Sequence, residues 1–165
     1  MSVRIEELDV AGIDRHASEL AQLLLDAHAA NMALGLAAPL NRERAADAWD
    51  ELRGVILAAF EDDTVVGAVC LTRATAENGR HRAEVQKLVV RTDQRGNGIG
   101  TALLDAVAER AKADGITLLW LTTHAGTRSD HFYERTGWTR VGEIPGYSLL
   151  PSGSLAANAF FYREL

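Results

Sequence analysis

Three glycines occupy every second position from 96 to 100, directly after Arg95. Because glycines carry no side chain, the backbone of this segment can turn tightly and approach a ligand closely. Apolar residues at helical spacing follow it and predict a helix, whose first turn offers unpaired N–H groups and the positive end of a dipole. The combination favours an anion, above all a phosphate, with Arg95 and Arg91 adding positive charge.

The spacing excludes two common nucleotide-binding loops. The dinucleotide fingerprint needs a third glycine three positions after its second, where this chain has Thr101 after Gly98. The nucleoside triphosphate loop ends in Gly-Lys-Ser or Gly-Lys-Thr, a sequence that this segment lacks.

Read as Arg-x-x-Gly-x-Gly, residues 95–100 resemble the pyrophosphate loop of the GNAT superfamily, the acetyl-CoA-dependent N-acetyltransferases. Residues 87–90 before the loop, and Phe132-Tyr133 followed by residues 136–138, agree with the family pattern, with Trp138 in place of a phenylalanine. The resemblance implies that acetyl-CoA is the co-substrate and is held by Leu88, Val89, Val90, Arg95, Gly96, Asn97, Gly98, Ile99, Gly100 and Thr101.

The same resemblance implies the catalytic groups. Glu84 lies on the expected strand before the loop, where the family places a glutamate that removes a proton directly or through water. Tyr133 corresponds to the tyrosine that points at the CoA sulfur, and a phenol keeps its proton at neutral pH and can act as general acid. In the family the strand splays at a bulge, so we expect the backbone near Leu88 and Val89 to stabilise the oxyanion.

Residues 83–88 and 140–147 also resemble the tabtoxin-resistance acetyltransferases, which act on a β-lactam amino acid toxin. In those enzymes an acidic residue stands where this chain has Thr122, and many family members have an asparagine where it has Gly126. Thr122, His124 and Tyr147 are candidates for contact with the acceptor. Trp49 and Trp120 follow helical and strand patterns, so we expect both in the core.

Composition limits the remaining choices. Seventeen Lys and Arg residues against 23 Asp and Glu give a net charge of −6, which argues against nucleic-acid or membrane partners and weakly favours a cationic acceptor. The single cysteine, Cys70, excludes an internal disulfide and fits a reducing compartment. The five histidines show no metal-binding spacing, so we expect no metal. We also expect a cytoplasmic protein, since no signal peptide or membrane span is visible.

The periodicity predicts the elements that would position these residues. We expect one α+β domain over residues 1–165, built on a mixed central sheet flanked by helices. Helices are predicted from 13 to about 34, around Trp49, over 99–111 and over 129–135. Strands are predicted over 3–8, 54–60, 64–75, 82–91, 116–122, 139–148 and 157–163.

We therefore expect an N-acetyltransferase that moves acetyl from acetyl-CoA to the primary amine of a small molecule, by direct transfer in a ternary complex. Two alternatives stay open at this point. One is a protein acetyltransferase acting on an N-terminus or a lysine, and the other is a CoA-binding sensor without turnover. Monomers and dimers both fit the family.

Overall fold

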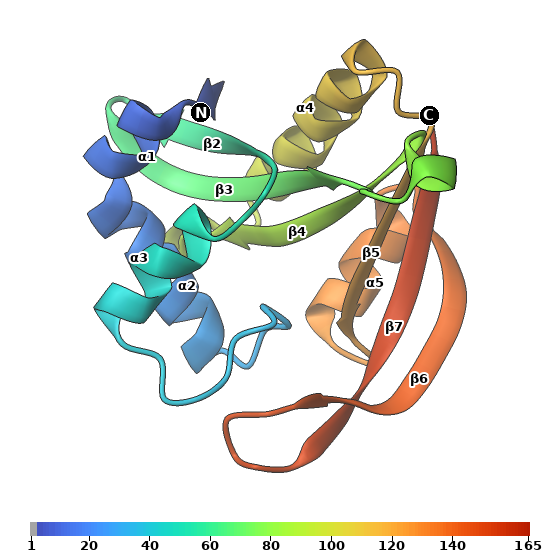
Figure 1. Cartoon of the computed structure of the whole chain (residues 1–165). Coiled ribbons are helices and arrows are strands. Elements are labelled where there is room, and N and C mark those ends of the chain that lie inside the picture. The colour runs from blue at the N-terminus through green and yellow to red at the C-terminus, as the bar shows by residue number, and fades with distance from the viewer. Residues whose placement is uncertain (1–2) are drawn as a thin grey trace.

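The computed structural model describes residues 3–165, and within them the chain forms a seven-stranded sheet with helices on both faces (Figure 1). The helices are α1 (Val10–Arg15), α2 (Ala17–Ala29), α3 (Arg42–Asp50), α4 (Ile99–Ala113) and α5 (Arg128–Arg135). The strands are β1 (Arg4–Leu8), β2 (Val55–Glu61), β3 (Thr64–Arg73), β4 (Arg82–Val90), β5 (Leu118–His124), β6 (Thr139–Leu149) and β7 (Leu155–Glu164). The predicted α+β architecture is confirmed.

The sheet has the strand order β1-β2-β3-β4-β5-β7-β6. All neighbours are antiparallel except β4 and β5. A parallel pair needs a crossover connection, and α4 supplies it between these two strands. The glycine segment therefore lies where β4 ends and the crossover begins.

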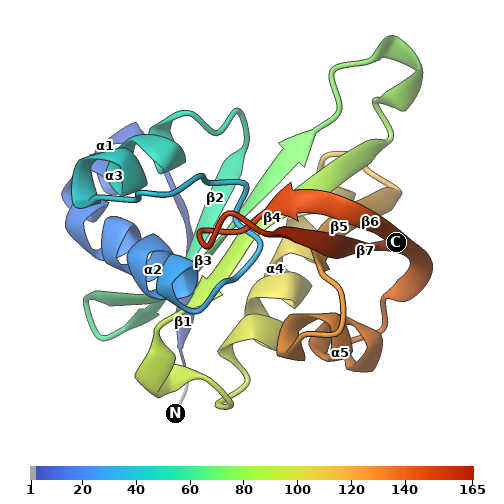
Figure 2. The ribbon, with the colours of Figure 1, turned by 90° about the horizontal axis from the view of Figure 1, so that it is seen from below.

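The helices cover the sheet from both sides (Figure 2). On one face, α4 packs Leu103, Leu104 and Val107 against apolar residues of β2–β5. On the other face, α2 and α3 bury Leu20, Leu24 and Trp49 against β2 and β3. Trp49 is 1% exposed and its Nε1 donates to the carbonyl of Leu20, so its predicted core position is confirmed.

The long helix predicted from residue 13 to 34 is wrong in its bounds. The segment forms α1 and α2, separated at His16, and α2 ends at Ala29. Asp9 caps α1 by accepting a hydrogen bond from the Gly12 N–H at 2.7 Å, and the His16 ring lies 2.7 Å from Glu19 Oε2. The apolar period continues across this break, which is why periodicity alone does not reveal it.

Candidate active site

The parallel pair β4–β5 separates soon after it forms. Its register covers three residue pairs, from Arg82–Leu118 to Glu84–Trp120, although the strands continue to Val90 and His124. A cavity of about 340 Å³ lies in the opening and is lined by residues 84–88 of β4 and by Thr122 and Thr123 of β5. The splay implied by the family resemblance is therefore present, and it begins at Glu84.

A β-bulge in β4 lies beside this opening. Val69 of β3 faces two residues, Lys87 and Leu88, and Lys87 has a positive φ of 51°. The extra residue shifts the strand's alternation, so that Leu88 packs toward the α4 side while Val89 is buried on the α2 side. The Lys87 Nζ donates to the Leu34 carbonyl at 3.2 Å, and burial lowers the pKa of this lysine.

The backbone after the bulge presents alternate residues to the opening. The Val89 carbonyl points at β3, because a Cβ on Gly67 would lie 3.1 Å from it. The Val90 carbonyl points the other way and accepts a hydrogen bond from Arg95 Nε at 3.1 Å. Since main-chain groups alternate along a strand, Leu88 and Val90 direct their N–H and C=O groups toward the opening and Val89 does not.

Glu84 lies where the splay begins and is partly buried. Burial raises the pKa of its carboxyl, while the neighbouring Gln86 and Lys87 side chains act in the opposite direction. A raised pKa makes a carboxylate a stronger base than an exposed one. Glu84 lines the cavity in the splay and also a second hollow on the sheet surface.

Tyr133 lines the same cavity from α5. Its ring packs among Phe132, Trp138 and Phe161, with centroid distances of 5.3, 6.0 and 5.6 Å. Burial raises the pKa of this phenol above its ordinary value, so it stays protonated at neutral pH. The cavity thus brings together Glu84 and Tyr133, which are 49 positions apart in the sequence.

Of the three residues predicted to contact the acceptor, two line the cavity and one does not. Thr122 and Tyr147 line the cavity. The Thr122 hydroxyl accepts a hydrogen bond from the amide of Asn158 at 3.3 Å, and Ser148 donates to Asn158 Oδ1 at 2.9 Å. His124 does not line the cavity; it is buried, and its Nδ1 bonds the Asn31 carbonyl at 2.9 Å.

The glycine segment joins β4 to α4. Gly96 and Gly98 have φ values of 87° and 83°, and a Cβ on either would meet no atom within 4 Å, so open space lies beside both. Gly98 caps α4 without a side-chain hydrogen bond, and the first turn of that helix holds no acidic residue. These features fit a pyrophosphate, since the N–H groups of residues 99–101 belong to the unpaired first turn.

Gly100 also permits close packing between two helices. A Cβ there would lie 3.3 Å from Phe132 Cζ, so the missing side chain lets α5 pack closely against α4. The Phe132 ring in turn contacts the Tyr133 ring, with a centroid distance of 5.3 Å. Asn97 is exposed and its Nδ2 donates to Gln94 within the loop, whereas Ile99 is buried in the core.

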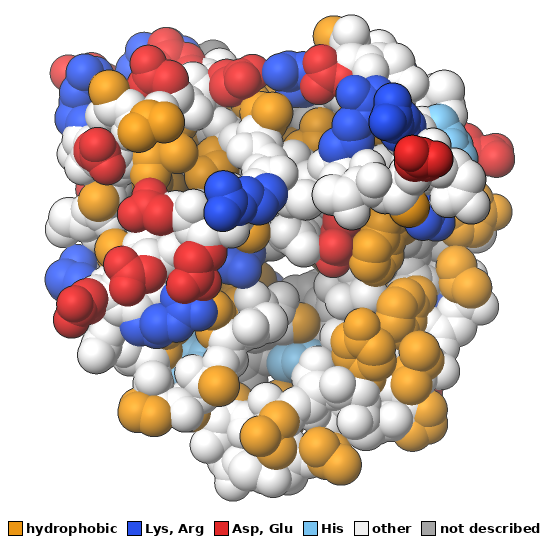
Figure 3. All heavy atoms as spheres, in the orientation of Figure 1, with side chains coloured by type: hydrophobic (Ala, Val, Ile, Leu, Met, Phe, Trp, Pro, Cys, Tyr) orange, Lys and Arg blue, Asp and Glu red, His pale blue; other side chains and the backbone are white. Residues whose placement is uncertain are grey.

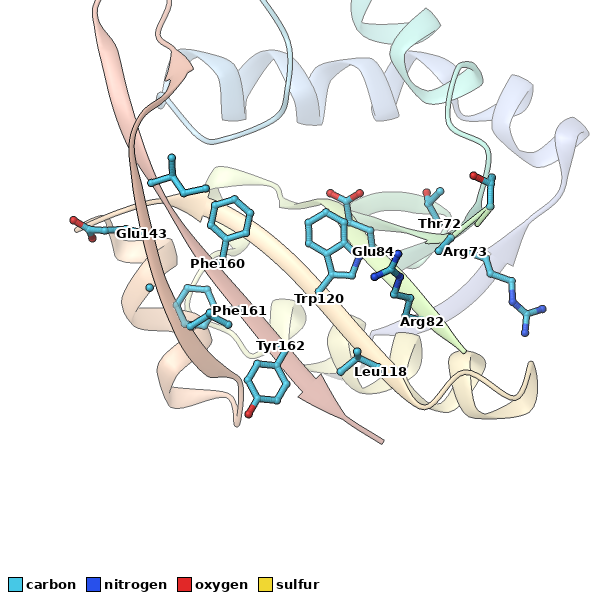
Figure 4. A pocket seen from close by; sticks show the side chains of 15 residues that line it. Thr72, Arg73, Arg82, Glu84, Leu118, Trp120, Glu143, Phe160, Phe161 and Tyr162 are labelled. Carbon is cyan, nitrogen blue, oxygen red and sulfur yellow. The ribbon is translucent and has the colours of Figure 1, made fainter. Parts of the chain in front are cut away.

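A groove of about 800 Å³ lies beside the cavity, and Glu84 belongs to both. Figure 4 shows Trp120 next to Glu84, with Phe160 farther along the groove. The expectation that Trp120 is a core residue is wrong: it is only partly buried and its side chain forms a wall of the groove. In the space-filling view a hollow lies near the middle of this face, with apolar side chains gathered over β6 and β7 (Figure 3).

Among residues 3–165, no helix has the length and apolar character needed to cross a bilayer. In the same described part, no group of three or more His, Cys, Asp or Glu side chains is placed to hold a metal ion.

Relatives of known name were found by sequence and by structure. Mycothiol acetyltransferase of Propionibacterium freudenreichii subsp. shermanii is 37% identical over 108 residues, which are 65% of this chain and 34% of that protein. The chain therefore spans about a third of that relative's length.

Two solved structures share the fold over nearly the whole chain. Ribosomal-protein-alanine N-acetyltransferase from Brucella melitensis matches with a TM-score of 0.78 and 22% identity, covering 98% of this chain and 99% of that one. A putative acetyltransferase from Salmonella typhimurium, solved with its cofactor acetyl-CoA, matches with a TM-score of 0.79 and 17% identity, covering 100% and 95%.

Residues 17–138, about three quarters of the chain, match the model of the acetyltransferase (GNAT) family. The matched range includes the glycine segment, Glu84 and Tyr133. The seven-stranded mixed sheet, the splay between β4 and β5 and the loop before α4 agree with that match. The chain belongs to the GNAT family of acetyltransferases.

Proposed function

We propose that this protein transfers acetyl from acetyl-CoA to the primary amine of a small molecule, directly and within a ternary complex. The observation that carries the proposal is the position of Glu84, on the wall shared by the cavity in the splay and the groove beside it. A donor in the cavity and an acceptor in the groove can meet at one carboxylate. Direct transfer then needs no acetylated enzyme.

The donor fits the elements around the cavity. Gly96, Gly98 and the first turn of α4 would hold the pyrophosphate, with Arg95 beside them. The main-chain groups of Leu88 and Val90 would pair with the pantetheine arm, as a peptide pairs with the open edge of a sheet. The similar fold of the Salmonella protein solved with acetyl-CoA supports this placement.

Three groups of the chain would carry the chemistry. Glu84, acting through a water molecule, accepts the proton that the acceptor's ammonium must lose. The amine nitrogen then bonds to the thioester carbon, and the Leu88 N–H donates to the carbonyl oxygen as it gains negative charge. The C–S bond breaks, and Tyr133 gives its proton to the departing thiolate. The nitrogen gives up its remaining extra proton, which returns the tyrosinate to the neutral phenol, and the products are an amide and free CoA.

An amino acid or a similar small amine is the acceptor we favour. The resemblance of residues 140–147 to the tabtoxin-resistance acetyltransferases supports it, and so does a curated relative named for mycothiol. Thr122 does not replace the acidic residue of the tabtoxin enzymes, because a hydroxyl cannot take up a proton as a carboxylate does. We therefore assign proton removal to Glu84 alone.

Calorimetry with acetyl-CoA, followed by injection of amines and amino acids into the same cell, tests the proposal. We expect cofactor binding and then heat of turnover with a small amine. Binding without turnover in any small-molecule pool, but with turnover of peptides, would favour a protein acceptor. Binding without any turnover would favour a sensor, and no binding would contradict the assignment of the glycine segment.

A further inference from the structure

The groove beside Glu84 is far larger than an amine alone requires. Its volume of about 800 Å³ is in the upper part of the range of small-molecule sites. Trp120 stands opposite Glu84 in the β4–β5 register, and Phe160 of β7 pairs with Thr122 of β5. The aromatic wall thus begins next to Glu84, the carboxylate that would accept the proton of the acceptor's ammonium (Figure 4).

The edge of the groove formed by β6 is also largely apolar. Val141 and Ile144 of β6 line it and are 69% and 48% exposed. Leu118 of β5 continues the floor next to Trp120. Exposed apolar groups that converge on one hollow favour a ligand with a large apolar body, because burying them releases water from both surfaces.

The charged side chains that line the groove differ in whether they already have a partner within the protein. The guanidinium of Arg73 donates to the carbonyls of Arg80 and Asp114, and Glu143 pairs with Arg140 at 2.7 Å. The guanidinium of Arg82 has no ion-pair or hydrogen-bond partner among residues 3–165. Its side chain rests against the turn at Gly79, since a Cβ there would lie 2.9 Å from Arg82 Nε.

Arg82 and Glu84 are two residues apart on β4, so both side chains leave the same face of the strand. Their Cα atoms are then about 6–7 Å apart at the usual rise of a strand. A free cation and a partly buried carboxylate at this spacing match the carboxylate and ammonium of one amino acid. A guanidinium fork is well suited to a carboxylate.

Building on the proposed function, we propose that the acceptor is a free α-amino acid with a large apolar side chain. Its ammonium lies at Glu84, its carboxylate at Arg82, and its side chain against Trp120 and Phe160. Arg82 and Trp120 are therefore specificity-determining residues of the acetyl transfer.

The free carboxylate separates this acceptor from its rivals. A decarboxylated amine such as phenethylamine has the apolar body and lacks the group that Arg82 would bind. The N-terminus of a peptide also lacks a carboxylate next to its amine. Alanine has both charged groups and lacks the apolar body.

The test measures kcat and KM for L-phenylalanine, phenethylamine, L-alanine and a peptide with N-terminal phenylalanine. We expect kcat/KM for L-phenylalanine to exceed that of each of the others at least tenfold. Arg82→Gln should raise KM for L-phenylalanine about tenfold and leave phenethylamine unchanged. Arg80→Gln is the matched control, because Arg80 is an exposed arginine outside the groove and should alter neither substrate.

Trp120→Ala tests the apolar wall separately. It should raise KM for L-phenylalanine at least tenfold and change that for L-alanine little, with acetyl-CoA affinity kept. Equal effects of Arg82→Gln on phenylalanine and phenethylamine, or a preference for alanine or the peptide, would overturn the inference.

Failure of the proposed function gives a different result. If acetyl-CoA does not bind, the proposed function fails, and calorimetric titration with L-phenylalanine alone still tests the groove. Binding of L-phenylalanine that Arg82→Gln weakens would support the inference in that case. If acetyl-CoA binds and L-phenylalanine neither binds nor reacts, the inference is wrong while donor binding stands.

Discussion

At the scale of single residues, burial gives Glu84 and Tyr133 opposite functions. It raises the pKa of both groups. For the carboxyl, this makes the ionised form a better base, and for the phenol it secures the proton that a general acid must donate. Both side chains line one cavity, although Glu84 comes from a strand that precedes the glycine segment in the sequence and Tyr133 from a helix that follows it.

Replacing Tyr133 with phenylalanine should lower kcat about 100-fold, because the thiolate would leave without a proton donor. The ring stays in its aromatic cluster, so the dissociation constant of acetyl-CoA and the melting temperature should change little. Stopped-flow or steady-state release of the CoA thiol measures the effect. An unchanged kcat would remove Tyr133 from the mechanism.

Glu84→Gln should separate activity from stability. The pKa of Glu84 is raised in the folded protein, so its stabilising contribution is complete below the unfolded value and is lost as pH rises through the folded value. Above that point an ionised, partly buried carboxylate costs free energy that a glutamine amide does not.

The glutamine variant should therefore melt higher than the wild type at pH 8 and equally at pH 4, while its kcat/KM falls about 100-fold. Thermal melts across this pH range, with the transfer assay at pH 8, check both parts. A variant that melts lower at pH 8 would show that the carboxylate stabilises the fold.

At the scale of elements, the loop between β4 and α4 and the opening between β4 and β5 determine where the donor can lie. The loop was predictable because its signal is local: alternate glycines between an apolar strand and a helical pattern. The bulge could be expected only from the family resemblance, because no glycine, proline or asparagine marks it in the sequence. Lys87 adopts a φ of 51° there because β3 and β4 pair on both sides of it. The break at His16 was missed for the same reason, because no glycine or proline marks it.

Gly98→Glu should weaken acetyl-CoA binding at least 100-fold, because bulk and negative charge would enter the space beside the loop. Gly115→Glu is a matched control at the other end of α4: its φ is 71° and a Cβ there also meets no atom within 4 Å. Each change should cost about 1–2 kcal/mol of stability, the strain of a left-handed residue with a side chain. Calorimetry should show lost binding for Gly98→Glu alone, and equal binding losses would contradict the loop assignment.

At the scale of the whole molecule, the splay divides the sheet into β1–β4 and β5–β7, joined in the sheet by three residue pairs. The groove is assembled across this division, from residues of β3, β4, β5, β6 and β7. No local pattern in the sequence brings Arg82, Trp120 and Phe160 together. A strand pattern predicts that Trp120 has a buried face and cannot tell a core from a groove.

A donor that fills the opening would contact both parts of the sheet and stabilise the folded chain. At a concentration 100 times its dissociation constant, acetyl-CoA should add about 2.7 kcal/mol to the free energy of unfolding. For a chain of this size, that corresponds to a rise of roughly 5–10 °C in melting temperature. Thermal melts should show the rise for the wild type and for Gly115→Glu, and its absence in the wild type would mean that the folded protein does not bind the donor.

A crystal structure with acetyl-CoA bound tests the central claim most directly, which is that Glu84 lies between donor and acceptor. We predict the pyrophosphate at residues 96–101, the thioester carbonyl within hydrogen-bonding distance of the Leu88 N–H, and the sulfur facing the Tyr133 hydroxyl. The acetyl group should point through the splay toward Glu84 and the groove. Acetyl-CoA bound in the groove, or with its thioester away from Glu84 and Tyr133, would contradict the account.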